Sequence, residues 1–461
     1  MHFDINKIMA GILIAAASLT SCKKLITIPS NPPSSITQQQ QFADSATAIT
    51  AVAGVYAYNQ GNGFAYSDGQ LTTACGLSAD ELSYTNTDDV IQFYSYNLTP
   101  LNNGIITLWG YPYRGIYQVN AVLNGITGNA NLSAAFQQQI TGEMEVVRAL
   151  YYFNMVNLFG GVPLVTSISY KETQRLPRST AADIYKQVMT DLTDARGKLT
   201  ASYPSSGRAR PNLYTAIALL AKVNLYQNNW QSAYNEADSV IKSGLYDLTN
   251  TPLTGVFLSG SQEAIWQIPA NQGYYGVSDA QRFIPYSSSA IPNYILTTSL
   301  LTAFEAGDKR LQNWVGATTP NGTTMYYPYK YKNVSASTTP TEDQMILRLA
   351  EMYLVRAEAA AHLNHLTEAL ADVNVIRTRA GLGASTADPA SQTAVLNAVM
   401  HERQVELFCE WANRWYDLKR TGTAQTVLNA VKTGFIAEAA LYPIPQAQIQ
   451  LNNLLIQNPG Y

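Results

Sequence analysis

The chain has 461 residues, about three domain equivalents at roughly 150 residues each, so it can build a large hydrophobic core without disulfide or metal cross-links. Only 13% of the residues are charged and the formal net charge is −3, so the chain lacks a basic field for polyanions, and nucleic acid is excluded as a partner. Tyrosine is abundant, with 30 residues, and its flat ring with a hydroxyl tip suits contact with neutral polar ligands.

The first 21 residues predict a signal peptide that is removed on export. Lys7 precedes an apolar run over residues 8–19, which is too short to span a bilayer. Leu19-Thr20-Ser21-Cys22 resembles the bacterial lipobox, in which the cysteine is lipidated. The sequence therefore predicts a mature chain that begins at Cys22 and is anchored by acyl chains. The alternative is an ordinary secretory signal with a chance cysteine.

Residues 22–41 predict the lipidated N-terminus and a flexible tether, because residues 30–41 combine prolines with a glutamine run. Residues 42–461 are predicted to form one domain. Cys75 and Cys409 are too few for a disulfide scaffold and lie far apart in the sequence. We expect two buried thiols, with a single bridge between them as the alternative.

Apolar residues spaced by three and four predict helices along much of the chain. The predicted helices cover residues 42–58, 109–126, 133–158, 181–199, 212–227, 230–243, 343–363, 366–380 and 392–411. Capping residues support several of them: Ser133 and Thr180 stand before two helices, and Ala380-Gly381 ends another. The pattern predicts a mainly α protein.

An internal repeat indicates how the predicted helices are arranged. Residues 221–240 and 357–376 align without a gap. The aligned pairs are Ala221 with Ala357, Asn228 with Asn364, Ala233 with Ala369 and Ala237 with Val373. Small residues let paired helices approach closely, and a turn residue between them lets the chain reverse, as in tetratricopeptide repeats. A short stack of such helix pairs is predicted, and coincidental spacing in alanine-rich helices is the alternative.

Two segments, about 60–100 and 244–340, show no helical pattern and are rich in tyrosine and in neutral polar residues. Loops of this length in a compact protein usually carry function. Some of their aromatic residues are expected to pack instead. Tyr327, Tyr329 and Tyr331 alternate as one face of a short extended segment, with Pro328 at its edge.

Signatures of catalysis and metal binding are mostly missing. His401 opens a zincin-like run without its second histidine, and His362 and His365 have no evident third ligand, so we predict no metal site. The paired carboxylates are Asp80 with Glu81, Asp88 with Asp89, and Glu305 with Asp308. Glycoside cleavage needs only two carboxyl groups across a bond, which sequence alone does not test. A helical stripe, Glu402, Glu406 and Glu410, lies near Arg403, Arg414 and Arg420, and structural ion pairs are its predicted role.

Several motifs, in order along the chain, resemble the SusD/RagB family. They are RALYYF at 148–153, LFGGVPL at 158–164, ILRLAEMYLVRAEA at 346–359, NVIRTRAG at 374–381, ERQVEL at 402–407, RWYDLKR at 414–420, LYPIP at 441–445 and QNPGY at 457–461. The resemblance covers nearly the whole mature chain. It implies a mainly α fold of tetratricopeptide-like helix pairs with a large, irregular, loop-rich half that binds ligand.

The resemblance also implies a function. Family members bind glycans, are not enzymes and use no cofactor. They sit as lipoproteins at the outer face of the outer membrane of Bacteroidetes-type bacteria, where they capture oligosaccharide and help to pass it to a SusC-type TonB-dependent transporter. Two other hypotheses remain open: a secreted helical glycoside hydrolase, or a tetratricopeptide-type scaffold that binds only protein.

A receptor for a neutral oligosaccharide needs exposed aromatic planes for stacking, with amide and charged groups around them for hydrogen bonds. Only the two irregular segments offer both. The predicted ligand-binding residues are Tyr66, Asp68, Tyr84, Asn86, Tyr274, Tyr275, Arg282, Tyr286 and Trp314. The family motifs do not include sugar-contacting residues, so the resemblance does not name the glycan.

Overall fold

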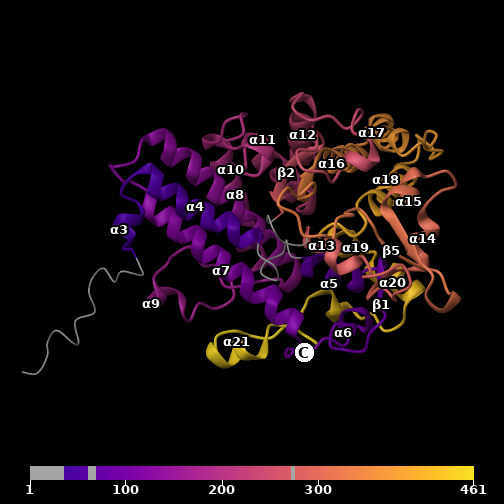
Figure 1. Ribbon diagram of the computed structural model, residues 1–461, viewed down its shortest axis with the longest axis horizontal. Coiled ribbons are helices and arrows are strands. Elements are labelled where there is room, and N and C mark those ends of the chain that lie inside the picture. The colour runs from indigo at the N-terminus through magenta and orange to yellow at the C-terminus, as the bar shows by residue number, and fades with distance from the viewer. Residues whose placement is uncertain (1–35, 61–68, 271–275) are drawn as a thin grey trace, which may run out of the picture.

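The protein is mainly helical, as the sequence predicts. Figure 1 shows the computed structural model, which describes residues 36–60, 69–270 and 276–461. The longer helices are α4 (Ser45–Gln60), α7 (Asn103–Ile126), α8 (Ala134–Phe159), α10 (Ala181–Lys198), α11 (Leu213–Tyr226), α12 (Trp230–Lys242), α16 (Leu349–His362), α17 (Leu366–Arg379) and α18 (Gln392–Glu406). Within the described residues, no helix combines the length and the apolar character needed to cross a membrane.

Short elements complete the fold. The short α-helices are α3 (Gln38–Gln41), α5 (Gln70–Ser78), α6 (Ile91–Ser95), α9 (Tyr170–Thr173), α13 (Ser278–Phe283), α14 (Thr298–Ala303), α15 (Lys309–Trp314), α19 (Asn413–Arg420), α20 (Ala424–Val431) and α21 (Gln446–Leu451). The 3₁₀ helices are η3 (Ser206–Arg208), η4 (Leu253–Gly255), η5 (Pro320–Gly322) and η6 (Ala437–Ala440). The strands are β1 (Leu82–Tyr84), β2 (Ala264–Pro269), β3 (Tyr294–Leu296), β4 (Val315–Thr318), β5 (Met325–Pro328) and β6 (Asp343–Arg348).

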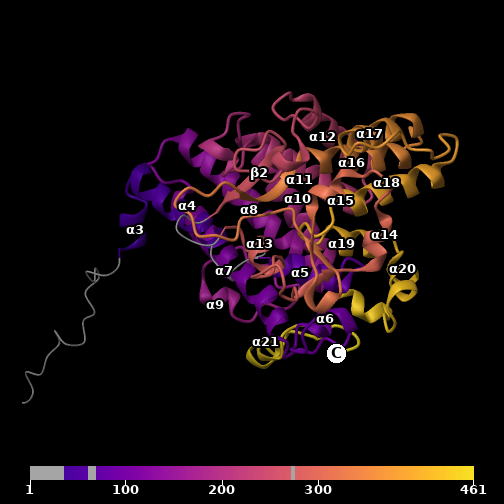
Figure 2. The ribbon, with the colours of Figure 1, turned by 45° about the vertical axis from the view of Figure 1, so that its right-hand side comes forward.

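The long helices form a stack that runs across the molecule. Contacts link α7 to α8, α8 to α10, α10 to α11, α11 to α12, α12 to α16, and α16 to α17. In Figures 1 and 2, α16, α17 and α18 lie together at the opposite end of the molecule from α3 and α4. The strands β1–β3, β2–β6 and β4–β5 form three antiparallel pairs. They belong to the irregular half, which packs beside the stack.

Capping interactions fix helix ends close to their predicted positions. The Ser133 hydroxyl accepts a hydrogen bond from the Phe136 N–H at the start of α8 (3.2 Å). Thr180 and Asp183 form a reciprocal capping box at the start of α10. Gly381 follows the end of α17 with φ +79°, a left-handed conformation that glycine adopts without strain.

Three expectations about secondary structure are wrong. Asp343–Arg348 forms strand β6, paired with β2, so α16 begins at Leu349 and not at residue 343. The helix predicted over residues 392–411 ends at Glu406, and the chain that follows is not helical, with positive φ angles of 49° and 56° at Cys409 and Trp411. The segment 60–100 contains helix α5, which is buried from Leu71 to Ser78 and therefore shows no amphipathic pattern.

The internal repeat corresponds to two helical hairpins, α11–α12 and α16–α17. The turn residues Asn228 and Asn364 both take the left-handed conformation, with φ 57° and 66°. The two turns also share a backbone hydrogen bond at the same position. The Asn229 N–H donates to the carbonyl of Asn224 (2.9 Å), and the His365 N–H donates to the carbonyl of Ala360 (2.8 Å). The alignment of the two segments therefore reflects the same local structure in both.

The alanines of the repeat lie at close helix contacts. Ala221, Ala357 and Ala369 have no exposed surface. Replacing any of them with leucine is expected to overpack the contact and to destabilise the fold by about 1–3 kcal/mol. Thermal melting measures the change, and Ala46→Leu at an exposed position of α4 is the control. Melts that match the wild type would contradict the close-contact assignment at that position.

A buried ion-pair network joins the stack to the irregular half. Glu402, Glu406 and Glu410 of the predicted stripe are all buried. Arg310 pairs with Glu402 and Glu406 (2.6 and 3.0 Å), and Arg348 pairs with Glu406 and Glu410 (2.5 and 2.8 Å). Burial by itself would raise the pKa of Glu406, but the surrounding arginines hold it below its usual range. The predicted structural role of the stripe is confirmed.

The arginines expected beside the stripe have other partners. The observed pairs are Arg403 with Asp417 (2.7 Å), Arg414 with Asp80 (2.7 Å) and Arg420 with Glu358 (2.5 Å). These arginines lie near the stripe in sequence, but their side chains pair with other carboxylates. The partners of the stripe come instead from residues distant in sequence.

Both cysteines of the folded part are free and buried, as expected. Cys75 lies beside the Tyr442 hydroxyl (3.7 Å), and burial raises the pKa of its thiol to about 12. Cys409 is also unpaired with another cysteine, so the alternative of a bridge between the two is wrong.

Part of the predicted tether is folded. The Thr37 hydroxyl caps α3 by accepting from the Gln40 N–H (3.2 Å). Gln38 donates to Asn124 on α7 (2.7 Å), and Gln41 donates to the carbonyl of Thr47 (2.6 Å). The prediction of a flexible tether is therefore wrong for the stretch that contains α3. The signal peptide, Cys22 and the rest of the tether lie outside the described residues.

Candidate functional site

The two irregular segments meet at the antiparallel pair β1–β3. Tyr84 at the end of β1 lies opposite Tyr294 at the start of β3, and their ring centroids are 5.1 Å apart. The Thr85 N–H donates to the carbonyl of Asn293 (3.0 Å), so the pairing continues past the strand. Segments that are about 200 residues apart in sequence thus form one surface, which we call the loop site.

Polar side chains surround the tyrosine pair of the loop site. The Tyr84 hydroxyl donates to the exposed carboxylate of Asp88 (2.7 Å), and the Asn86 amide donates to the side-chain oxygen of Asn293 (3.0 Å). Partial burial and the bond to Asp88 raise the pKa of Tyr84, so this phenol stays protonated at neutral pH. The site therefore offers a half-buried, un-ionised aromatic ring beside exposed amides and the carboxylate of Asp88.

Helix α13 closes one side of the loop site. A Cβ on Gly69 would lie 2.7 Å from both the Arg282 side chain and the Asp279 carboxylate. Only glycine therefore lets the start of α5 lie this close to α13. Arg282 is half-buried there. The chain entering α5 at Gly69 and the chain entering α13 after Gly276 are thus held against each other.

The predicted ligand-binding residues separate into four groups, of which buried Trp314 forms one by itself. Tyr84, Asn86 and Arg282 lie at or beside β1–β3. Tyr286 is 95% exposed in the turn that follows α13. The remaining tyrosines and aspartate of the prediction lie outside the described residues: Tyr66, Asp68, Tyr274 and Tyr275.

Trp314 is not a surface for ligand stacking. Its side chain is completely buried, its indole N–H donates to the carbonyl of Leu253 (3.0 Å), and its ring packs edge-on against Phe257. The Lys330 ammonium lies 4.8 Å from the ring centroid. The prediction for Trp314 is therefore wrong, because this tryptophan belongs to the core beneath the ion-pair network.

Sequence reasoning did not select Asn293 and Tyr294, although both belong to the loop site. Asn293 holds Asn86, and Tyr294 forms the other half of the tyrosine pair. A weak signal exists for them. Tyr294-Ile295-Leu296 is a short β-prone run directly after Pro292, which predicts a strand start.

The described residues contain no group of three or more histidine, cysteine, aspartate or glutamate side chains that could hold a metal ion. His401 bonds to the carbonyl of Ala303 (2.8 Å), and His362 stacks on Trp230. Of the carboxylates noted in the sequence, Asp80 is neutralised by Arg414, while burial raises the pKa of neighbouring Glu81 to about 8. Both of these carboxylates are buried, so they lie below the surface and away from any ligand in solvent.

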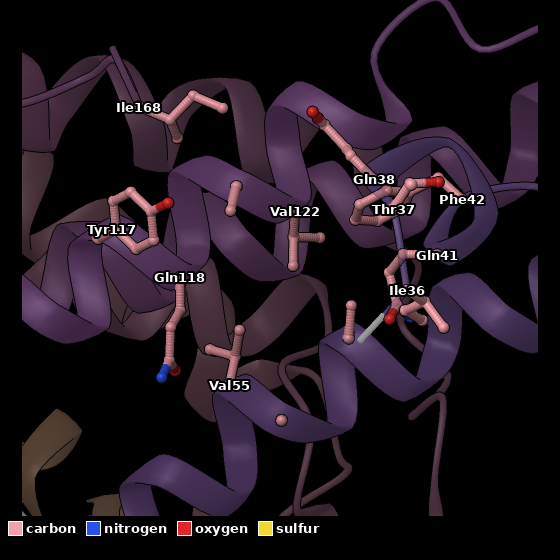
Figure 3. Close-up of a pocket in the computed structure, with 13 residues that line it drawn as sticks. Ile36, Thr37, Gln38, Gln41, Phe42, Val55, Tyr117, Gln118, Val122 and Ile168 are labelled. Carbon is pink, nitrogen blue, oxygen red and sulfur yellow. The ribbon is translucent and has the colours of Figure 1, made fainter. Parts of the chain in front are cut away.

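A cavity of about 440 Å³ lies elsewhere, where α3 meets α4 and α7. Figure 3 shows Tyr117 and Val122 on one side, Phe42 and Gln41 on another, and Val55 below them. The described residues that line this cavity include no charged residue and none of the predicted ligand-binding residues. Its walls combine aliphatic side chains with Phe42, Tyr117 and three glutamines.

The arrangement of paired helices beside a loop-rich half is that of the SusD superfamily. A SusD superfamily protein from Bacteroides vulgatus has the same fold, with a TM-score of 0.78 at 21% identity over 91% of this chain and 100% of that one. A laminarin-binding SusD-like protein matches with a TM-score of 0.77 at 24% identity, again over 91% and 100% of the two chains.

Sequence comparison agrees with the fold. The SusD family profile matches residues 302–461, and a second profile, described as starch-binding and associating with the outer membrane, matches residues 30–225. SusD-like protein P25 of Formosa agariphila is 24% identical over 98% of this chain and 99% of its own. The starch-binding protein SusD of Bacteroides thetaiotaomicron is 33% identical over 28% of this chain and 24% of its own. The chain belongs to the SusD/RagB family.

Proposed function

We propose that this protein is a lipid-anchored, glycan-binding protein of the outer cell surface that captures oligosaccharide at the loop site and passes it to a SusC-type TonB-dependent transporter. The observation that carries the proposal is the loop site itself, where the tyrosine pair Tyr84 and Tyr294 stands beside the exposed amides of Asn86 and Asn293. Sugars present apolar C–H faces edged by hydroxyl groups, and this combination of rings and amides matches both.

The named activities of relatives support the ligand class. One relative is a starch-binding protein, one structure of the same fold binds laminarin, and one matching family profile is described as starch-binding. Both polysaccharides are neutral glucans. Among the described residues, Asp88 bonds to Tyr84 and Arg282 lies beside Tyr294, so the charged neighbours of the tyrosine pair are of opposite sign, which suits a neutral ligand.

The proposed contacts can be tested by substitution at Tyr84. Tyr84→Ala is expected to weaken oligosaccharide binding by up to about tenfold, because an aromatic contact contributes about 0.5–1.5 kcal/mol. Tyr84→Phe keeps the ring and should lose less. Isothermal titration with maltohexaose and laminarihexaose measures both variants, and Tyr170→Ala, at a 74% exposed position on α9, is the matched control. Wild-type affinity in Tyr84→Ala would remove Tyr84 from the site.

Tyr66, Asp68, Tyr274 and Tyr275 remain proposed contacts on the strength of the sequence alone. The double variant Tyr274→Ala, Tyr275→Ala tests them as a group. It should weaken binding more than Tyr84→Ala does, because two stacking rings are removed together. Unchanged affinity in the double variant would limit the site to the β1–β3 surface.

Lipid anchoring is proposed from the lipobox at Cys22. Cys22→Ala is expected to move the protein from the membrane fraction to the soluble fraction, because the protein would lose its acyl chains. Cell fractionation followed by immunoblotting measures the distribution, and Cys75→Ala, which changes a buried thiol, is the control. A membrane fraction equal to that of the wild type would contradict anchoring through Cys22.

Two other functions give different results in the same experiments. A glycoside hydrolase would shorten labelled polysaccharide, whereas a binding protein leaves chain length unchanged. A protein-binding scaffold would fail to bind any glycan on an array while still co-purifying with the transporter. Binding without cleavage, together with co-purification, is the outcome that the proposal requires.

A further inference from the structure

A cleft of about 490 Å³ lies on the helical stack, separate from the loop site. The turn before α12 and the end of α16 form one side of it, and α18, α19 and α20 form the other. None of these elements contributes a residue to the loop site. The volume is within the range of about 300–1,000 Å³ that small-molecule sites in proteins occupy.

An aromatic pair forms one wall of this stack cleft. The indole of Trp230 and the imidazole of His362 stack with ring centroids 3.8 Å apart and planes 10° from parallel. Of the 6 tryptophans in the chain, Trp230 alone is not buried. Burial lowers the pKa of His362, so the pair is neutral at pH 7. An aromatic wall of this kind accepts the apolar face of a ring-shaped ligand.

The stack cleft also contains polar groups without protein partners. Among the described residues, the side chains of Asn228, Asn397 and His362 accept or donate no hydrogen bond. These amides and ring nitrogens provide both donors and acceptors. Leu396, Met400 and Leu418 cover the space between them with apolar surface. A few polar groups set in an apolar lining are typical of sites that orient a small ligand.

The charges at the stack cleft are already neutralised. Glu358 accepts two hydrogen bonds from Arg420 (2.5 and 2.7 Å), and Arg414 is bound by two oxygens of Asp80 (2.7 and 2.8 Å). A charged ligand would have to compete with these bidentate pairs, which are strong in a buried setting. The cleft therefore favours a neutral ligand.

We propose that the stack cleft is a second binding site, for a neutral mono- or disaccharide that stacks on the Trp230–His362 pair and bonds to Asn228 and Asn397. The choice of a sugar among neutral ring-shaped molecules rests on the function proposed above. The geometry of the cleft does not depend on the loop site, so the two sites can be tested independently.

Trp230 provides a direct signal for the test. The mature lipoprotein in detergent is labelled with 5-fluorotryptophan, and the ¹⁹F resonance of Trp230 is identified by its absence in Trp230→Phe. Maltose and laminaribiose are then titrated to about 10 mM, roughly tenfold above a Kd of 1 mM. At least one disaccharide is expected to shift the Trp230 resonance while the resonances of the buried tryptophans stay in place.

Two variants assign the signal to the stack cleft. Asn397→Phe, at an exposed position of α18, fills the cleft and should abolish the shift while leaving the melting temperature unchanged. Tyr84→Ala should leave the shift intact, because it alters only the loop site. No movement of the Trp230 resonance with either disaccharide, or an equal movement in Asn397→Phe, overturns the second site. Oligosaccharide binding at the loop site is measured by titration calorimetry. A failure of the proposed function is therefore distinguished from a failure of the second site.

Discussion

Replacing Arg348 with methionine is expected to destabilise the fold by about 3–5 kcal/mol, because truncating one partner leaves buried carboxylates without compensation. The Arg348 side chain is 1% exposed and donates to Glu263, Glu406 and Glu410 at 2.5–2.8 Å. Methionine fills similar space but supplies no donor. Urea unfolding followed by circular dichroism measures the loss.

A surface arginine provides the matched control. Arg196 pairs with Glu236 at 2.7 Å, but its side chain is 51% exposed. Arg196→Met is expected to change stability by no more than about 1 kcal/mol, since exposed ion pairs contribute little. Equal losses in the two variants would contradict the view that burial, and not pairing by itself, makes Arg348 essential.

Lys419 is expected to make stability depend on pH. Its ammonium is buried and bonds to the carbonyl of Ala440 (3.1 Å) and to that of Asn157, and burial lowers its pKa from 10.5 to about 7. Between these two pH values the unfolded chain holds the proton and the folded chain does not. The unfolded state then binds more protons, so folding stability rises as pH increases from 7 towards 10.5.

The variant Lys419→Met isolates this effect. The stability of the wild type relative to Lys419→Met should increase by about 1.4 kcal/mol per pH unit between about pH 7 and pH 10.5 and should level off outside this range. Lys242→Met, which changes a side chain that is 72% exposed, is the control and should show no such slope. Urea unfolding at several pH values measures the difference. A flat difference between wild type and Lys419→Met would show that Lys419 stays protonated in the fold.

The long amphipathic helices and their repeat could be predicted from the sequence, because helix period and turn chemistry are local. Asn228 and Asn364 align in sequence and share the same left-handed turn. Strand β6 could not be predicted, because all of its residues are buried and their pattern fits a helix equally well. This segment forms a strand because it pairs with β2, which is distant in sequence.

The loop site could be predicted only by composition. Tyrosines and amides in the irregular segments indicated the surface, and β1–β3 brings Tyr84 and Asn86 together with Asn293. Composition did not separate an exposed ring from a buried one, so Trp314 was selected although the core surrounds it. The cleft at Trp230 gave no sequence signal, since its walls come from helices spread over much of the chain.

Charged residues are scarce in this chain, and many of them are buried in ion pairs such as those of Arg310, Arg348 and Arg403. The solvent-facing surface is therefore covered largely by neutral groups, and it projects little electric field. Such a surface steers charged molecules only weakly, and a neutral ligand reaches it by undirected diffusion, which dissolved ions do not screen. The rate at which a neutral ligand associates with this protein is therefore expected to change little with salt concentration.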